Sequence, residues 1–382
     1  MSRFDDQPPV TGDPLLSPRP IRPETRLRSG SRNGRSGGGG RGPRSLAGLL
    51  AAVAVVLVGA VALGLGRDYS EAPTESAGSV AEAPSKRVVV SDPANTALVR
   101  WVAGGLLDVV SVVPEGANGH TYEPIPADAI VAATADLYIE NGRGLNDAVS
   151  AFVRANYPPG TPEVVLADVI PDGEVIATDS AEQIATHGHA HSFNAHFWTD
   201  PIYASLYVER IAEALSSIDP VNTTTYTTRA QEFVARMSTY DAAFRAAIAS
   251  IPEQNRKLVV YHDSWSYFGR RYGIPVVGAI QPVSFSEPSA DEVRRMIDQI
   301  RAEGVPAFFG SEVFPSDVLE AIAAETGSIY YSDLSDEEVP GSPGTPEHSY
   351  EGMMLQNVRL ITSALGGDTS LLDSLELPEV IS

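Results

Sequence analysis

Histidine is the residue type whose positions in this chain could do chemistry, and there are seven of them. His120 lies in a loop after a predicted strand, His262 directly follows the apolar run KLVVY, and His196 stands just before a predicted helix. Ligands of parallel α/β sheets gather beyond the carboxyl ends of the strands, so these three imidazoles can meet at one place. Imidazoles joined by a carboxylate suit Zn²⁺ and, less selectively, Mn²⁺ or other divalent ions.

The other histidines fit this interpretation less directly. His187, His189 and His191 alternate with small residues in a polar loop, which is typical either of a metal-scavenging tract or of a solvated linker. His348 stands alone in a Pro-rich loop near the C-terminus, and we expect it to be an ordinary histidine.

Several kinds of chemistry are excluded. The chain has no cysteine, so it has no disulfide, no thiolate ligand, no thiol nucleophile and no lipid-bearing N-terminal cysteine. It also lacks the H-E-x-x-H, G-x-S-x-G and P-loop patterns. A metal held by four protein ligands has no open position at which to activate water, so we expect a binding protein and not an enzyme. A metallohydrolase is the competing class, and it would need an open coordination position and a general base.

The charge is divided between a basic tail and an acidic body. The 382 residues include 27 Lys and Arg against 49 Asp and Glu, a net charge of −22, which argues against nucleic-acid binding. Residues 1–45 are rich in Arg, Gly, Ser and Pro and are predicted to be a disordered cytoplasmic tail. Residues 46–65 are uncharged and apolar and predict a transmembrane signal anchor or a cleaved signal peptide, followed by a linker at 66–85.

The body alternates apolar strand patterns with helical ones, which predicts α/β architecture with mainly parallel sheets flanked by helices. Asn95 and Asp200 are candidate N-caps, and the stretch from about 221 to 251 carries apolar residues at helical spacing, long enough to cross between two lobes. We therefore expect an N-terminal lobe at 86–218, a connecting helix at 219–252 and a C-terminal lobe at 253–382.

Four ordered segments carry a family resemblance. They are Gly116–Pro124, Asn194–Pro201, His262–Phe268 and Ser332–Leu334, the last being followed by a predicted helix. Together they resemble the metal-binding solute-binding proteins of zinc and manganese ABC importers, in which a rigid helix joins two lobes. The resemblance covers roughly residues 86–366. One departure is that Asn118-Gly119 stands where the family usually has Asp-Pro.

The resemblance implies His120, His196, His262 and Asp333 as the metal ligands, with Glu312 as the alternative to Asp333 or as its neighbour. It also favours zinc, because manganese members often have Glu at the position of His262. The His-rich loop before His196 is common among zinc-binding members.

We therefore expect a monomeric, extracytoplasmic zinc-binding protein, anchored in the cell membrane through residues 46–65, that delivers Zn²⁺ to the permease subunit of an ABC importer. The alternatives within this interpretation are manganese or broad divalent-metal specificity. A metal-dependent surface adhesin is a further alternative.

Overall fold

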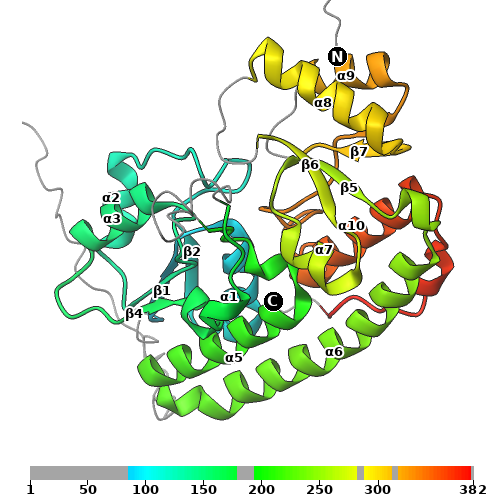
Figure 1. Cartoon of the computed structure of the whole chain (residues 1–382). Coiled ribbons are helices and arrows are strands. Elements are labelled where there is room, and N and C mark those ends of the chain that lie inside the picture. The colour runs from blue at the N-terminus through cyan, green and yellow to red at the C-terminus, as the bar shows by residue number, and fades with distance from the viewer. Residues whose placement is uncertain (1–84, 179–192, 282–287, 312–316, 380–382) are drawn as a thin grey trace, which may run out of the picture. The chain divides into compact units, whose positions relative to one another are not determined.

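The computed structural model describes residues 85–178, 193–281, 288–311 and 317–379. The predicted membrane segment 46–65, the histidines at 187, 189 and 191, and Glu312 lie outside these ranges. Among the helices that are described, none has both the length and the apolar character needed to span a bilayer. Ala77–Ser382 forms one compact unit, which contains two α/β lobes (Figure 1).

The first lobe is built on a four-stranded parallel sheet with the order β2-β1-β3-β4. In its central strands Val88–Val90 and Leu137–Glu140 are buried, as expected for a parallel sheet covered on both faces. The strands are β1 (Arg87–Val90), β2 (Asp108–Ser111), β3 (Leu137–Glu140) and β4 (Glu163–Val165), and the helices are α1 (Pro93–Ala103), α2 (Pro126–Ala132) and α3 (Asp147–Asn156).

The second lobe repeats this plan with the strand order β6-β5-β7-β8, again all parallel. Its strands are β5 (Leu258–His262), β6 (Val276–Gln281), β7 (Ala307–Phe309) and β8 (Ile329–Tyr331). Its helices are α7 (Ser266–Tyr272), α8 (Ala290–Glu303), α9 (Asp317–Thr326) and α10 (Tyr350–Ala364). In both lobes the first strand is central, so the chain reverses its direction of winding beside that strand.

Two long helices follow the first sheet, and the second of them connects the lobes. α5 (Pro201–Ile218) begins at the N-cap Asp200, whose side chain accepts the N–H of Ile202, with Pro201 in the first turn as predicted. α6 (Thr223–Ser250) has 28 residues, about 42 Å of helix, and runs along the base of both lobes (Figure 1). Its buried side chains recur every three to four residues. They are Tyr226, Ala230, Phe233, Met237, Tyr240, Phe244, Ala247 and Ile248.

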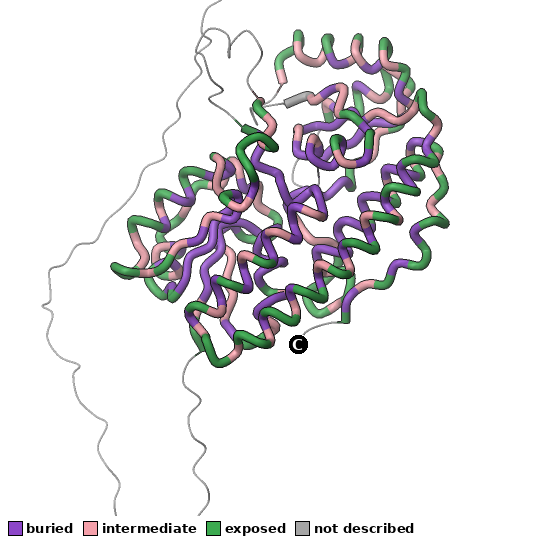
Figure 2. Tube along the Cα trace, turned by 60° about the horizontal axis from the view of Figure 1, so that its bottom comes forward, coloured by how far each residue is buried: buried purple, intermediate pink, exposed green. Residues whose placement is uncertain are grey.

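A continuous apolar core extends through both lobes. It includes Val90 of the first sheet, Phe244 of α6, and Val260 and Ile361 of the second lobe. Figure 2 shows this burial along the strands and at intervals along the long helices. Pulling the lobes widely apart would expose part of this shared core to water, so the packing resists a large hinge motion.

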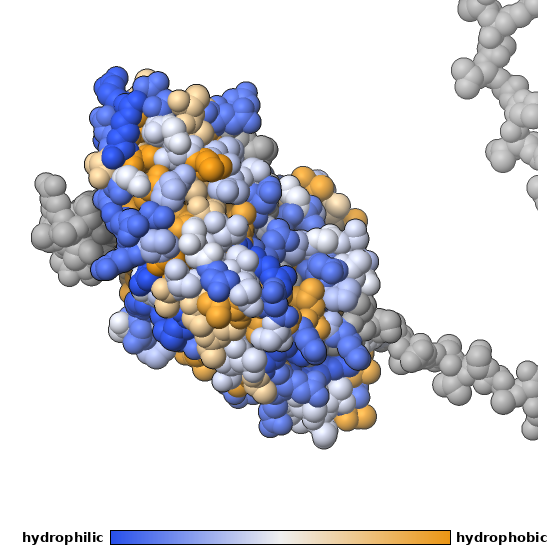
Figure 3. All heavy atoms as spheres, turned by 90° about the vertical axis from the view of Figure 1, so that its right-hand side faces the viewer, coloured by the Kyte–Doolittle hydropathy of each residue, from blue (hydrophilic) through white to orange (hydrophobic). Residues whose placement is uncertain are grey.

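One face of the body is mostly polar. Figure 3 shows the face at the right of Figure 1, where hydrophilic residues predominate and apolar residues lie between them in small groups. This arrangement fits the acidic composition of the body.

The alternation of strands and helices is as predicted, and one predicted cap is wrong. The N-cap of α1 is Asp92 and not Asn95, because the Asp92 carboxylate accepts the N–H of Asn95 at 3.0 Å. Asn95 is a buried residue inside the first turn, and its amide contacts Asp92 and the Asn141 side chain. The exact limits of the predicted domains stay a prediction.

Candidate metal centre

His120 is presented by a turn after β2. The Asn118 side-chain oxygen accepts the N–H of Thr121 at 2.9 Å and its hydroxyl at 3.2 Å, so that residues 118–121 form a compact turn around His120. Gly116, at the start of this loop, has φ of +86°, a conformation that favours glycine. The local sequence therefore shapes the loop that carries the first imidazole.

His196 lies just before the short 3-10 helix η3 (Phe197–Thr199), and its ring is oriented by Asn194. The Asn194 Oδ1 lies 3.0 Å from His196 Nδ1 and 3.1 Å from the His196 backbone nitrogen, while the Asn194 Nδ2 donates to the Asp263 carbonyl at 2.6 Å. Because the bond to Asp263 turns the Asn194 amide oxygen toward His196, His196 Nδ1 carries the proton and donates it to that oxygen. His196 Nε2 then keeps a lone pair for a metal.

His262 is the last residue of β5, the strand beside which the second sheet reverses its winding. It lies at the carboxyl end of the strand, where ligands gather in open parallel sheets. It is 7% exposed. The sequence prediction that His262 lies at a strand end is thus confirmed.

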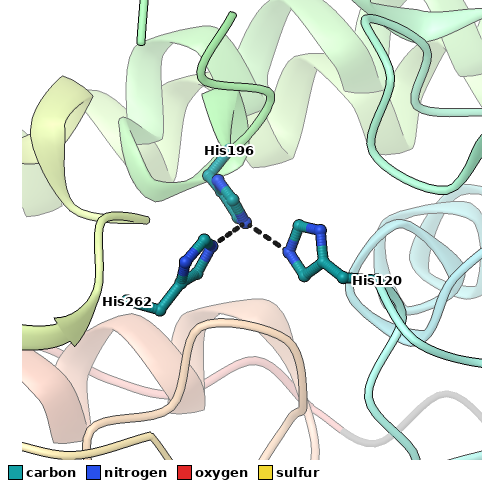
Figure 4. A group of neighbouring side chains, drawn as sticks. All are labelled: His120, His196 and His262. Atoms are coloured by element: carbon teal, nitrogen blue, oxygen red, sulfur yellow. Dashed lines mark hydrogen bonds between the residues drawn. The ribbon is translucent and has the colours of Figure 1, made fainter. Parts of the chain in front are cut away.

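The three imidazoles converge at one point between the lobes. His196 Nε2 lies 3.0 Å from His120 Nε2 and 3.1 Å from His262 Nε2 (Figure 4). All three residues offer a ring nitrogen within 4.8 Å of the others. Zn–N bonds of ~2.0–2.1 Å in a tetrahedron separate the nitrogens by about 3.3–3.4 Å. The two separations from His196 Nε2 are therefore within a few tenths of an ångström of those that a tetrahedral ion requires.

The environment keeps two of these imidazoles neutral. Burial, together with repulsion from a charged His262, lowers the pKa of His120 to about 3. Burial likewise holds the pKa of His196 well below its usual value, with the neighbouring His262 and His120 adding to the effect. Neutral imidazoles have the free lone pairs that metal binding needs, so the site is prepared for a cation without first losing protons.

Two buried carboxylates complete the group. Glu337 Oε1 lies 3.3 Å from His120 Nε2, and Glu337 Oε2 accepts the N–H of Gly119 at 2.7 Å. His196, Asp336 and Glu337 form a second set of potential ligands within 4.8 Å of one another. His196 belongs to both sets and Glu337 contacts His120 of the first, so the five side chains form one cluster of imidazoles and carboxylates.

Asp333, which the resemblance implies as the fourth ligand, is not in either set. Its side chain is exposed and accepts a hydrogen bond from the Ser332 hydroxyl at 2.7 Å. The chain turns inward only after it, because Leu334 to Glu337 are all buried. Asn357 holds this turn: its Oδ1 accepts the N–H of Ser335 at 2.9 Å, and its Nδ2 donates to the Ser335 carbonyl.

Asp333 therefore stays a prediction, while the structure brings Asp336 and Glu337 of the same segment to the imidazoles.

Comparison with known proteins adds a family match. A family model described as "Zinc-uptake complex component A periplasmic" matches residues 88–364. The iron-binding protein YfeA of Yersinia pestis is 28% identical over 266 residues, which cover 69% of this chain and 81% of that protein. The manganese-binding lipoprotein MntA of Halalkalibacterium halodurans is 23% identical over 311 residues, 81% of this chain and 96% of that protein.

A solved structure agrees with the fold. The periplasmic zinc-binding protein TroA of Treponema pallidum matches with a TM-score of 0.65 and 25% identity, covering 74% of this chain and 99% of that chain. The names of these three similar proteins specify iron, manganese and zinc, respectively. The likeness therefore indicates metal binding in general and leaves the choice of metal to the chemistry of the site.

Proposed function

We propose that this chain, a member of the periplasmic zinc-uptake component A family, captures zinc outside the cytoplasm and delivers it to the permease of an ABC importer. The family comprises metal-binding solute-binding proteins of such importers. Members of this family are binding proteins and not enzymes, and they work with permease and ATPase components. The metal is thus the cargo of this protein.

The observation that carries the proposal is the convergence of His120, His196 and His262 between the lobes, with ring nitrogens within 4.8 Å of one another. Two of the three are buried and the third is mostly buried. Buried imidazoles that approach one another this closely are expected where a cation is bound.

The fourth donor is the point at which the resemblance and the geometry differ. The resemblance implies Asp333, whereas the geometry supports Glu337, whose Oε1 already lies 3.3 Å from the Nε2 of His120. In the proposed shell, three neutral imidazoles and one carboxylate surround Zn²⁺ and leave a net charge of +1. A closed shell of this kind retains the ion and leaves no position for a reacting water.

The proposed shell supports zinc because its three imidazole nitrogens outnumber its single carboxylate donor. One observation favours a second candidate, a manganese- or iron-binding protein of the same kind. Asp336 lies with His196 and Glu337 in the second set of potential ligands, so a fifth donor is close at hand. Manganese and iron accept more oxygen ligands than zinc does, and Asp336 could serve them.

The location is also part of the proposal. Residues 46–65 are proposed as a membrane anchor that keeps the body extracytoplasmic and the basic tail in the cytoplasm. The name of MntA describes that relative as a lipoprotein. The present chain has no cysteine to carry a lipid, which supports an anchor made by the polypeptide itself. The metal-binding body is proposed to act as a monomer.

Competition titrations on the full-length chain test the metal preference. Zn²⁺, Mn²⁺ and Fe²⁺ would be titrated separately against chelators of known affinity, together with elemental analysis of the purified protein. The proposal predicts one tightly bound zinc per chain and much weaker Mn²⁺ binding. Equal or tighter binding of Mn²⁺ or Fe²⁺, or no tightly bound metal, would contradict it.

A further inference from the structure

The exposure of the three histidines indicates where the metal leaves. His196 and His262 are 3% and 7% exposed, and they lie at the bottom of the site. The His120 side chain is 13% exposed and belongs to the loop after β2. Because the lobes share a core that resists wide opening, the smallest motion that frees the ion is a displacement of this loop away from the second lobe.

Two adjacent glutamates of the second lobe hold that loop by its backbone. Glu337 Oε2 accepts the N–H of Gly119 at 2.7 Å, and Glu338 Oε1 accepts the N–H of Gly116. Both acceptors are carboxylates, and hydrogen bonds to charged groups are stronger than neutral ones. The residue before His120 must also have an N–H for this contact, which the glycine at 119 supplies and a proline could not.

The two glutamates differ in what else they contact. Glu337 also faces His120, so any change at Glu337 alters the proposed coordination as well as the loop. Glu338 is not in either set of potential ligands. It accepts the N–H of Gly116, three residues before the Gly119 that Glu337 contacts. Around Glu338, Glu115 is a like charge that opposes the contact and His348 is a group that favours it. Glu338 can therefore be changed without removing a ligand.

We propose that Glu338 is a positioning residue that latches the loop carrying His120 onto the second lobe and thereby sets the rate of metal release. The inference rests on the proposed function, because it assigns a release step to the metal site described above. Each time the loop lifts, the Glu338–Gly116 hydrogen bond has to break. Weakening that bond makes lifting more frequent while the same side chains still surround the ion.

The test measures zinc release from the full-length chain by stopped-flow mixing with saturating fluorescent chelator. Glu338→Ala removes the acceptor, Glu338→Asp keeps the charge but shortens the reach, and Glu338→Gln keeps the reach but removes the charge. The latch predicts release about 10-fold or more faster for Glu338→Ala and Glu338→Asp, and a smaller acceleration for Glu338→Gln. Glu347→Gln, an exposed glutamate in the segment before α10, is the matched control and should release zinc like the wild type.

The absorption spectrum of the Co²⁺-loaded variants separates positioning from coordination. The latch predicts an unchanged spectrum in all Glu338 variants, because the ligands stay the same. An altered spectrum would mean that Glu338 binds the metal. A rate that changes equally in Glu338→Ala and Glu338→Gln but not in Glu338→Asp would assign the effect to charge alone. Either result overturns the latch, as does wild-type release in all three variants.

One measurement needs no variant. In the zinc-loaded wild type, hydrogen exchange should be slow at the Gly116 amide, because that N–H is donated to Glu338. Fast exchange at Gly116 would refute the latch even if the variants failed to fold. Failure of the proposed function would look different, because the wild type would then bind no zinc that depends on His262.

Discussion

Replacing Glu337 by glutamine tests the assignment of the fourth ligand, with Asp333→Asn as its matched control. Both changes exchange a carboxylate for an amide of nearly the same size. Glu337 is 5% exposed and lies against His120, whereas Asp333 is exposed and bonded to its neighbour Ser332. The geometry therefore predicts a large loss of zinc affinity in the first variant and almost none in the second.

The magnitude follows from two effects at Glu337. The amide loses the negative charge that a metal ligand supplies, and an interaction with a charged group contributes about 1.5–3 kcal/mol. With its oxygen kept on the Gly119 N–H, the new amide also turns its NH₂ group toward His120 Nε2, 3.3 Å away. That hydrogen bond must break before zinc binds, at a cost of about 1 kcal/mol. The sum corresponds to about a 100-fold loss of affinity, or somewhat more.

Zinc competition titrations on full-length variants measure this loss, with circular dichroism to verify that each variant is folded. Asp333→Asn should change the affinity by no more than about 2-fold, as for other exposed charges. A larger loss in Asp333→Asn than in Glu337→Gln would refute the assignment and restore Asp333 as the ligand. Equal losses in both would refute the claim that one carboxylate dominates.

Three further outcomes follow from the same site. His262→Ala should lower zinc affinity by roughly 10-fold or more in competition titration, because it removes a ligand, and unchanged affinity would exclude His262 from the shell. Asn194→Ala should cost about 10–100-fold in affinity, because His196 loses the group that orients its ring; wild-type affinity would show that Asn194 has no such role. The third outcome concerns pH, because the pKa of His120 is lowered to about 3 from 6.5. Below pH 6.5 the unfolded metal-free chain gains a proton that the folded chain does not, so the free energy of unfolding decreases as the pH is lowered. At pH 5 the loss from this group is ~2 kcal/mol, and urea unfolding of His120→Gln at pH 7.5 and 5.0 should show that much less pH dependence; an equal pH dependence would contradict a neutral His120.

Most of the fold was predictable because local signals and the core agree. The pair Asp200-Pro201 marks the start of α5, and the apolar spacing around Phe233 and Phe244 marks the buried side of α6. The N-cap of α1 was assigned three residues too late, because Asn95 and Asp92 are both good capping residues. Only the backbone conformation, with Asp92 extended and Asn95 already helical, decides between them.

The histidines were predictable for a different reason than the carboxylate. His120 follows a strand of the first sheet and His262 ends a strand of the second, and ligands gather at the carboxyl ends of parallel strands, so these strand-end positions indicated both residues. The carboxylate depends on where the chain after β8 turns inward, and that is set by Asn357 of α10, more than twenty residues later in the sequence. A long-range contact of this kind leaves no local pattern, and so Asp333 and Glu337 could not be distinguished.

Crystallography of the zinc-loaded full-length chain, with anomalous data at the zinc absorption edge, tests the central claim most directly. The account predicts one strong peak about 2.0–2.1 Å from the Nε2 atoms of His120, His196 and His262, with one carboxylate oxygen completing the shell. A peak bonded to fewer than two of these imidazoles, or located away from the junction of the lobes, would contradict it.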